Sequence, residues 1–248
     1  MEIQSRKNPE IVKIVSLKDK KHRDELGLYL VEGEKSVKEA LRYGAEVVSV
    51  IGTEEALKNY APGEYKVITV TKQIADYCSD SVTPQGVLAV VKKPENRLIA
   101  PLSNAVLLDN VQDPGNVGTI IRTMTAVGVK DVYTVRCADP FSPKAVRASM
   151  SGIFSVNVHD GDYNEVLKAL DGVTIISGDM NGENVFDYKP VGKFCLAIGS
   201  EGKGLSDAVK SASGAVVKIP MTSRMESLNA GVSASILLYQ LTFNQHKE

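Results

Sequence analysis

The 248-residue chain is 43% hydrophobic and 24% charged, values typical of soluble globular proteins, and it is long enough for two domains or one large α/β unit. Its 20 glycines and 10 prolines exclude a fibrous or low-complexity chain, and its net charge of −1 means that any nucleic-acid-binding surface must be local. Because no apolar run reaches the roughly 20 residues of a membrane-spanning helix and the start lacks the apolar segment of a signal peptide, we expect a cytoplasmic protein.

The first 24 residues carry a local excess of positive charge. Ile11, Ile14 and Leu17 recur at helical spacing after Asn8 and Pro9, which predicts an amphipathic helix whose cations face solvent. Such a basic stripe is either a solvated helix face or a phosphate-binding surface, and both interpretations stay open at this point. The candidate RNA-binding residues of this segment are Arg6, Lys7, Lys20, Lys21 and Arg23.

Residues 28–91 alternate short apolar runs with helical stretches, which predicts a small α/β domain. The polar run 92–97 breaks this periodicity and is predicted to be a linker, so that the domains span residues 1–97 and 98–248. The expected strands are 28–32, 47–51, 66–70 and 87–91, and the expected helices are 34–43, 54–59 and 72–78.

A second series of apolar runs, separated by helix-length intervals, predicts a mostly parallel sheet that is covered on both faces. The expected strands are 105–109, 131–135, 153–158, 173–177, 194–199 and 215–219. The last helix, expected over 227–243, has small residues at 230, 231 and 233–235. Small residues permit close approach, so we expect this helix either to pack tightly against a second element or subunit or to be an ordinary buried helix.

Ligands of an open parallel sheet bind beyond the carboxyl ends of its strands. The loop after the expected strand 105–109 reads DNVQDPGNVGTIIR, in which Pro114 and Gly115 predict a turn and Asn116 is placed to cap the next helix. Arg122 follows within two helical turns, where its guanidinium is suited to bind phosphate or carboxylate.

Two later loops contain further candidate residues. Residues 199–205, GSEGKGL, follow an expected strand, but their glycine spacing fits neither the dinucleotide-binding pattern nor the P-loop. Residues 220–229, PMTSRMESLN, follow the next strand, and Ser227 there is equally well explained as a helix cap.

Taken together, the three loops resemble the signature motifs of the SpoU (TrmH-like) RNA ribose 2′-O-methyltransferases. The motifs are N-x-G-x-x-x-R at 116–122, I-G-S-E-G-K-G-L at 198–205, and I-P-M at 219–221 with S-L-N-A-G-V-S at 227–233. The resemblance covers residues 105–243. The stretch 31–51 is also similar to the substrate-binding domain of that family, and the basic helix within 5–23 is similar to its ribosomal-RNA branch.

The resemblance implies a fold, a cofactor and an assembly. The fold would be a small N-terminal α/β domain akin to ribosomal proteins, followed by a parallel-sheet α/β SPOUT domain with a deep trefoil knot. The cofactor would be S-adenosyl-L-methionine, and the protein would be a homodimer that acts on structured RNA. The matching cofactor-binding residues are Gly199, Ile219, Met221 and Leu228.

The resemblance also implies catalytic residues. Arg122 would be a cation that binds the target nucleotide and stabilises negative charge on the ribose oxygen, because a guanidinium with a pKa above about 12 is a poor base. Asn116 would orient the Arg122 loop, Glu201 could pair with Arg122, and Ser227 and Asn229 would position substrate. Lys144 and Arg147, after the cap-like Ser142–Pro143 pair, are further candidate RNA-binding residues, with solvated helix positions as the alternative.

Other functions explain the sequence less well. A nicotinamide-dependent oxidoreductase needs G-x-G-x-x-G after its first strand, and DPGNVG does not fit. A non-catalytic RNA-binding ribosome-assembly factor would be expected to lose Arg122, Glu201 or Asn229, and all three are present. Transfer RNA remains an alternative to 23S ribosomal RNA as substrate. The three cysteines and three histidines are isolated, so we predict no metal site and no role for them in catalysis.

Overall fold

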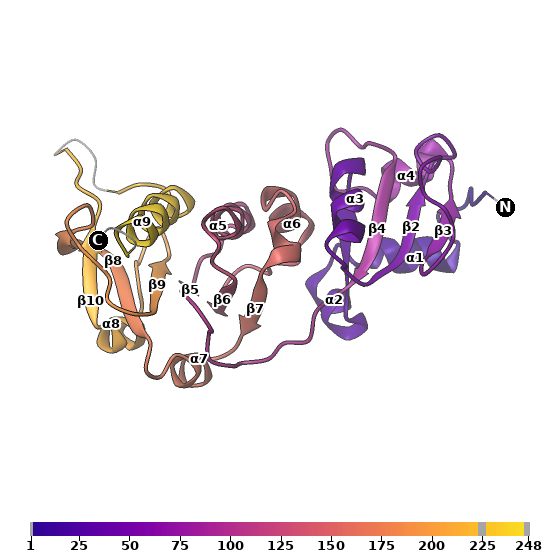
Figure 1. Ribbon diagram of the computed structural model, residues 1–248. Helices are drawn as coiled ribbons and strands as arrows, with labels where there is room; N and C mark the ends of the chain where they lie inside the picture. Colours follow the sequence, from indigo (N-terminus) through magenta and orange to yellow (C-terminus); the bar gives the residue numbers. More distant parts are fainter. Residues whose placement is uncertain (1, 223–226, 246–248) are drawn as a thin grey trace. The chain divides into compact units, whose positions relative to one another are not determined.

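The computed structural model describes residues 2–222 and 227–245. The chain forms two compact units, which Figure 1 shows with their elements labelled. Unit 1 contains Met1–Lys93 and Phe141–Phe154, and unit 2 contains Pro94–Pro140 and Ser155–Glu248. The division therefore differs from the predicted domains 1–97 and 98–248 in two respects: the first boundary follows Lys93, and a short segment from the second half of the chain belongs to unit 1.

Unit 1 is built on a four-stranded sheet of order β1-β4-β2-β3. Strand β4 is antiparallel to β1 and β2, whereas β3 is parallel to β2. The strands are β1 (Leu28–Glu32), β2 (Val47–Gly52), β3 (Lys66–Thr69) and β4 (Val87–Lys92). The helices are α1 (Pro9–Ser16), α2 (Lys20–Leu26), α3 (Glu34–Arg42), α4 (Lys72–Cys78) and α6 (Pro143–Ala148).

The local signals of unit 1 explain its first helix. The Asn8 side chain accepts a hydrogen bond from the Glu10 amide (2.9 Å), and Pro9 occupies the first helical position. Ile11 and Ile14 are buried against α4 residues such as Ile74, so an amphipathic helix over residues 9–16 is confirmed. The basic segment continues in a second helix, α2, and one of its cations, Arg23, is buried rather than solvent-facing. Residues 54–59, in contrast, form turns instead of the predicted helix. Their backbone amides donate hydrogen bonds to carbonyls either three or four residues earlier, and the segment is too short to sustain a regular helix.

Unit 2 contains a six-stranded sheet of order β10-β8-β9-β5-β6-β7, and every strand pair in it is parallel. The strands are β5 (Ala105–Asp109), β6 (Asp131–Val135), β7 (Asn157–Asp160), β8 (Thr174–Asn184), β9 (Phe194–Gly199) and β10 (Ala215–Lys218). The predicted parallel sheet is confirmed. The strand expected over 153–158 is instead a 3-10 helix, η1 (Gly152–Ser155), followed by β7.

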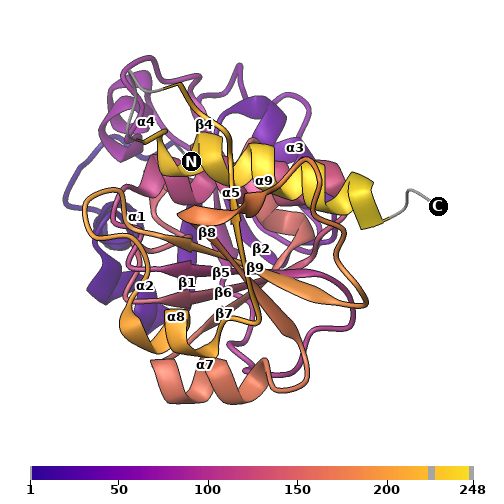
Figure 2. The ribbon, with the colours of Figure 1, turned by 90° about the vertical axis from the view of Figure 1, so that its left-hand side faces the viewer.

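Helices cover both faces of the unit 2 sheet. Helices α5 (Pro114–Val127) and α9 (Ala230–Gln245) lie side by side on one face, and α7 (Tyr163–Ala169) and α8 (Asp207–Ala212) lie on the other (Figures 1 and 2). The small residues of α9 face α5: a Cβ atom on Gly231 would lie 3.2 Å from Thr119 Cγ2, and the hydroxyls of Ser235 and Thr123 are 2.8 Å apart. The expected tight packing of this helix is therefore made within the chain, against α5.

The predicted linker is bound along the edge of unit 2. Asn96 forms a reciprocal pair with Asp160 of β7, donating to its carbonyl (2.8 Å) and accepting from its amide (2.9 Å). Next to it, the carbonyl of Ile99 accepts from the Tyr133 hydroxyl (2.6 Å). The chain from residue 94 to 99 is thus part of unit 2, which explains why the boundary precedes it.

The predicted trefoil knot requires the segment between β10 and α9. Residues 223–226 of that segment lie outside the described residues, so the knot stays a prediction. In the part of the chain that the structure describes, no helix is long and apolar enough to cross a membrane.

Candidate active site

A pocket of about 260 Å³ opens in unit 2 beyond the ends of β9 and β10 and beside the middle of β8. Its lining includes all the predicted cofactor-binding residues and two predicted catalytic residues; they are Gly199, Ile219, Met221, Leu228, Glu201 and Ser227. Asp179 and Met180 of β8 and Leu237 of α9 also line it, and the sequence analysis missed them. Because we expected β8 to end at residue 177, applying the carboxyl-end rule there would have pointed to residues 178–180.

Three predicted catalytic side chains meet at the rim of this pocket. The Glu201 carboxylate oxygen Oε1 accepts hydrogen bonds from the Asn116 amide (2.7 Å) and from the Asn229 amide (2.9 Å). Asn229 Nδ2 also donates to Asn116 Oδ1 (2.9 Å). These contacts join the start of α5, the loop after β9 and the segment before α9, which are far apart in the sequence, into one polar cluster.

The helix caps differ from those that the sequence predicts. Asp113, not Asn116, caps α5, because its carboxylate accepts from the amides of Gly115 (2.6 Å) and Asn116 (3.1 Å). Asn229, not Ser227, caps α9: its Oδ1 accepts from Gly231 (3.0 Å) and the next amide (3.2 Å). The Asn116 side chain is therefore available to Glu201, and Ser227 lines the pocket ahead of the helix.

Arg122 lies on α5 with its side chain exposed to solvent. Within residues 2–222 and 227–245, the Glu201 carboxylate bonds the two asparagines, and no ion pair joins it to Arg122. The expected pairing of Glu201 with Arg122 is therefore replaced by the asparagine cluster. An exposed guanidinium remains available to an anionic group of a ligand.

Comparison with protein-family models and with known proteins shows the family to which this chain belongs. The model described as the SpoU rRNA Methylase family matches residues 103–239, and the MRM3-like substrate binding domain matches residues 8–89. The chain is 31% identical to the 23S rRNA (guanosine(2553)-2′-O)-methyltransferase RlmP of Bacillus subtilis, over 97% of this chain and 98% of the relative. The chain belongs to the SpoU rRNA methylase family.

Two solved structures of similar methylases contain S-adenosylmethionine. An AdoMet-bound rRNA methyltransferase from Sinorhizobium meliloti has a TM-score of 0.90 with 27% identity, over 100% of this chain and 99% of that chain. The SpoU methyltransferase AviRb from Streptomyces viridochromogenes, in complex with AdoMet, has a TM-score of 0.88 with 25% identity, over 96% of this chain and 98% of that chain. The predicted family, the α/β fold class with a parallel sheet, and the cofactor are thus confirmed.

The pocket of this methylase suits a nucleoside that carries a positive charge. Ile219, Leu228 and Leu237 supply apolar walls for a flat base, and the carboxylates of Asp179 and Glu201 supply acceptors for hydroxyl or cationic groups. At Gly199 the chain passes itself so closely that a Cβ atom would lie 2.2 Å from the carbonyl carbon of Gly204. Only glycine fits there, because any side chain would displace the loop that forms one wall of the pocket.

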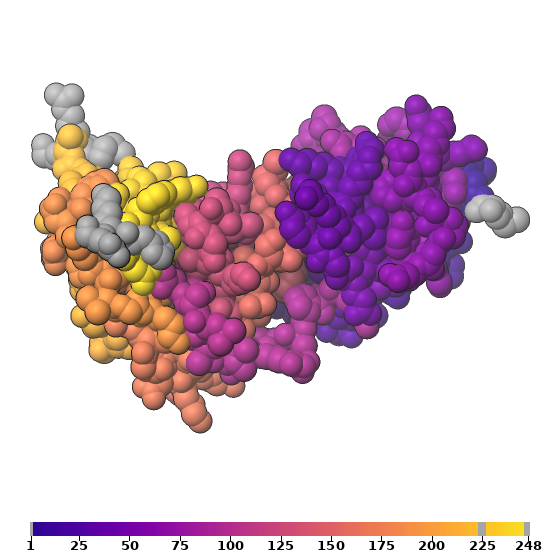
Figure 3. All heavy atoms as spheres, viewed as in Figure 1, coloured from indigo at the N-terminus to yellow at the C-terminus, as the bar shows by residue number. Residues whose placement is uncertain are grey.

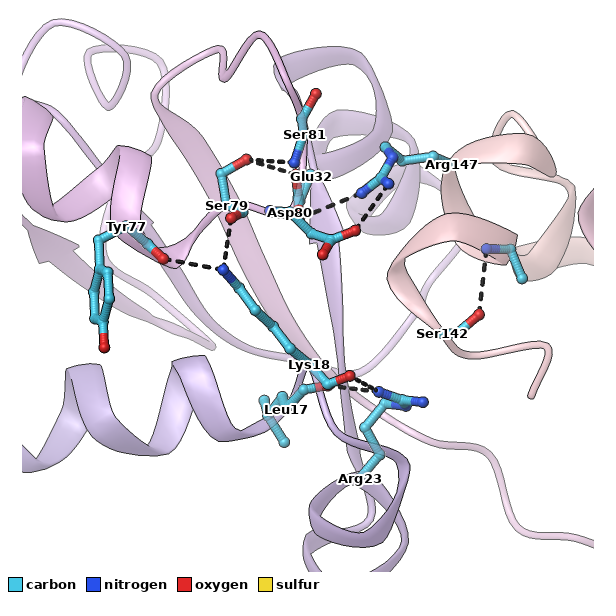
Figure 4. Close-up of polar contacts among 11 residues, drawn as sticks. Leu17, Lys18, Arg23, Glu32, Tyr77, Ser79, Asp80, Ser81, Ser142 and Arg147 are labelled. Atoms are coloured by element: carbon cyan, nitrogen blue, oxygen red, sulfur yellow. Dashed lines mark hydrogen bonds and ion pairs between the residues drawn. The ribbon is translucent and has the colours of Figure 1, made fainter. Parts of the chain in front are cut away.

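The predicted RNA-binding residues of the methylase's first 24 residues do not share one environment. Arg6, Lys7, Lys20 and Lys21 are exposed; the Arg6 guanidinium lies 4.5 Å from the centre of the Tyr77 ring, and Lys20 pairs with Asp24 (2.6 Å). Arg23 is 2% exposed, and Figure 4 shows its guanidinium donating to the carbonyls of Leu17 (2.8 Å) and Lys18 (2.9 Å). Arg23 therefore stabilises unit 1 from within and is not part of its surface.

Arg147 is also held by protein groups. It donates to Asp80 (2.9 Å) and lies 3.7 Å from Glu32, whose side chain is 7% exposed (Figure 4). These contacts attach α6 to the rest of unit 1. Arg147 is therefore engaged in structural ion pairs, which compete with its predicted contact with RNA. Lys144, on the same helix, is exposed. Among the described residues of the methylase, no cluster of three or more metal-ligating side chains is found.

Proposed function

We propose that this methylase transfers a methyl group from S-adenosylmethionine to a ribose 2′-hydroxyl of structured RNA, with large-subunit ribosomal RNA as the substrate. The proposal depends mainly on one observation: a single pocket at the end of a parallel sheet contains the residues predicted to bind the cofactor, with the Asn116–Glu201–Asn229 cluster at its rim. The name of the Bacillus subtilis relative supports ribosomal RNA over the alternative, transfer RNA.

The chemical difficulty of this reaction lies in the acceptor. S-adenosylmethionine supplies a methyl group that is already activated by a sulfonium, whereas a ribose hydroxyl is not ionised at neutral pH. The site must therefore hold the oxygen in line and stabilise the negative charge that develops on it. Arg122, exposed on α5, supplies a permanent positive charge for the oxygen or its neighbouring phosphate, and the proton leaves to phosphate or water.

The Asn116–Glu201–Asn229 cluster fixes the relative positions of the three segments that form the site. Glu201 uses one oxygen for both asparagines, so that the position of the β9 loop is tied to the starts of α5 and α9. We assign Asn116, Glu201 and Asn229 to this task, and Ser227, which faces the pocket, to contacts with substrate or cofactor.

Unit 1 supplies the contacts to the rest of the RNA. The exposed cations Arg6, Lys7, Lys20, Lys21 and Lys144 are the proposed phosphate-binding residues. The match of residues 8–89 to a substrate binding domain supports this assignment. Because the relative that matches nearly the whole chain is a bacterial ribosomal-RNA methyltransferase, and bacterial ribosomes are made in the cytoplasm, we also infer a cytoplasmic location.

The enzyme acts as a homodimer. Helix α9, yellow in Figure 3, carries an exposed apolar stripe of Val232, Tyr239 and Phe243, which are 47%, 44% and 60% exposed. A stripe of this kind on one helix marks an interface, and a second copy of the chain is its proposed partner. Ala230 and Ser233 of the same helix line the pocket, so pairing through α9 would bring the subunit interface next to the active site. The trefoil knot belongs to this proposal as the fold that brings the β9 and β10 loops together.

One experiment tests the activity and identifies the target. The purified protein is incubated with labelled S-adenosylmethionine and total RNA, and the RNA is then cleaved with alkali. A ribose whose 2′-oxygen is methylated resists cleavage, so a single protected position in the 23S RNA is the expected result. Label in transfer RNA alone would overturn the choice of substrate, and tight RNA binding without label would favour a non-catalytic assembly factor.

A further inference from the structure

Asp109 is a buried carboxylate that the proposed mechanism does not use. It ends β5, its side chain is 0% exposed, and its backbone lies opposite Gly199 in the β5–β9 pair. Its Oδ2 accepts a hydrogen bond from the backbone N–H of Ser206 (2.6 Å), and its Oδ1 accepts one from the Tyr163 hydroxyl (2.8 Å). Asp109 therefore contacts both ends of the segment 199–206.

That segment forms one wall of the cofactor pocket. Ser200 and Gly204 exchange two backbone hydrogen bonds (3.1 and 2.9 Å), which close the segment into a tight loop. Ser200, Glu201 and Gly204 line the pocket, whereas neither Asp109 nor Tyr163 is among its lining residues. Any influence of Asp109 on the cofactor must therefore pass through the position of this loop.

Tyr163 donates the hydrogen bond to the second oxygen, Oδ1, of the Asp109 carboxylate. It is the first residue of α7, and its ring lies 5.3 Å from the guanidinium carbon of Arg136. Burial raises the pKa of the Tyr163 hydroxyl, so it stays protonated and donates at neutral pH. Because a buried carboxylate needs donors on both oxygens, the hydroxyl fixes the orientation in which Oδ2 faces Ser206.

We propose that Asp109 and Tyr163 are positioning residues of the S-adenosylmethionine pocket: Asp109 fixes the 199–206 loop, and Tyr163 fixes the orientation of the Asp109 carboxylate. The identity of the ligand rests on the proposed function, but the hydrogen bonds that hold the loop do not.

The test compares two tyrosine variants of the full chain. Tyr163→Phe removes the donor to Asp109 (2.8 Å) and the contact of the same hydroxyl with the Ser206 side chain, and Tyr133→Phe removes the hydroxyl bond to the Ile99 carbonyl (2.6 Å) from the same unit. We expect S-adenosylmethionine to bind about tenfold more weakly to Tyr163→Phe in calorimetry without RNA, and within about twofold of wild type to Tyr133→Phe. Equal affinities of Tyr163→Phe and wild type, or an equal loss in both variants, would overturn the inference.

Asp109 itself gives a second comparison. In Asp109→Asn the side-chain oxygen still accepts from Ser206 and the amide donates to the Tyr163 oxygen, so we expect cofactor affinity close to wild type. Asp109→Ala removes both contacts, and we expect an affinity loss larger than that of Tyr163→Phe. An Asn variant as weak as Tyr163→Phe would contradict the positioning role.

Hydrogen exchange separates this inference from the proposed function. In the cofactor-free protein, the Gly204 and Ser206 amides should exchange faster in Tyr163→Phe than in wild type, while Tyr133→Phe leaves them unchanged. If wild type fails to bind S-adenosylmethionine, the proposed function fails even where the exchange rates change as expected. Unchanged exchange in Tyr163→Phe overturns the positioning role whatever the ligand is.

Discussion

Asp113 and Asn116 differ by one chemical group, and that difference shapes the candidate site. The Asp113 carboxylate only accepts hydrogen bonds, so it caps the amides at the start of α5. The Asn116 amide can donate, so it reaches Glu201, where a second carboxylate would be repelled. A residue three positions from the cap thus becomes part of the site because of its donor.

Arg122 is the residue on which turnover should depend. We expect Arg122→Ala to reduce methyl transfer at least about a thousandfold and to leave the affinity for S-adenosylmethionine within about twofold, because only charge on the acceptor is affected. Single-turnover methylation and calorimetry measure the two effects. A fully active Arg122→Lys variant would argue against a bidentate contact by the guanidinium.

Arg23 makes a different contribution from its exposed neighbours. Arg23→Ala removes the donors to two backbone carbonyls in the interior of unit 1, and we expect a stability loss of about 1–3 kcal/mol. Lys20→Ala removes the exposed ion pair with Asp24 and should cost about 0.5 kcal/mol or less. Urea unfolding measures both; equal losses would show that burial of Arg23 does not matter.

At the scale of elements, α9 links packing to the site. The side-chain oxygen of Asn229 caps the helix, and the nitrogen of the same side-chain amide donates a hydrogen bond to Glu201. Gly231 allows the first turn of the helix to lie against Thr119 of α5. The pocket wall formed by Ala230 and Ser233 therefore depends on how closely these two helices approach.

This dependence predicts the effect of a larger side chain. Gly231→Leu should push α9 away from α5 and destabilise the chain by about 1–3 kcal/mol, with a weaker affinity for S-adenosylmethionine. Val12→Leu, at a position on α1 that is 55% exposed, is the control and should change neither quantity measurably. Thermal unfolding and calorimetry provide the measurements, and a Gly231→Leu protein with normal cofactor affinity would contradict the argument.

At the scale of the whole molecule, the chain passes between its two units more than once. It leaves unit 1 after Lys93, returns for Phe141–Phe154 and then completes unit 2. The returning segment is held in unit 1 by Arg147, between Asp80 and Glu32. Unit 1, which contains the proposed RNA-binding cations, therefore includes a segment that interrupts the catalytic unit in sequence.

The assembly can be tested through the exposed stripe of α9. Changing Tyr239 and Phe243 together to aspartate places charges on the proposed interface, and we expect the dimer to dissociate to monomers in analytical ultracentrifugation. Val12→Asp, at a position on α1 that is 55% exposed, is the control and should leave the mass unchanged. A wild-type protein that sediments as a monomer would refute the proposed dimer.

The sequence alone determined the parallel sheet of unit 2, the family and four of the residues that line the pocket. These follow from local patterns: apolar runs mark buried strands, and the loops after them carry the motifs. Gly199, Ile219, Met221 and Leu228 were found in this way, and all four line one pocket.

The tertiary structure alone decided which polar groups meet. A sequence pattern shows that Asn116 can cap a helix, but only the fold shows that Asp113 already does so and that Glu201 lies within reach. The same holds for Arg23, whose burial depends on how α2 folds back onto the carbonyls of Leu17 and Lys18 at the end of α1, and for Asp109, whose partners come from distant segments. Hydrogen bonds between distant segments depend on their relative position in space, which neither periodicity nor composition encodes.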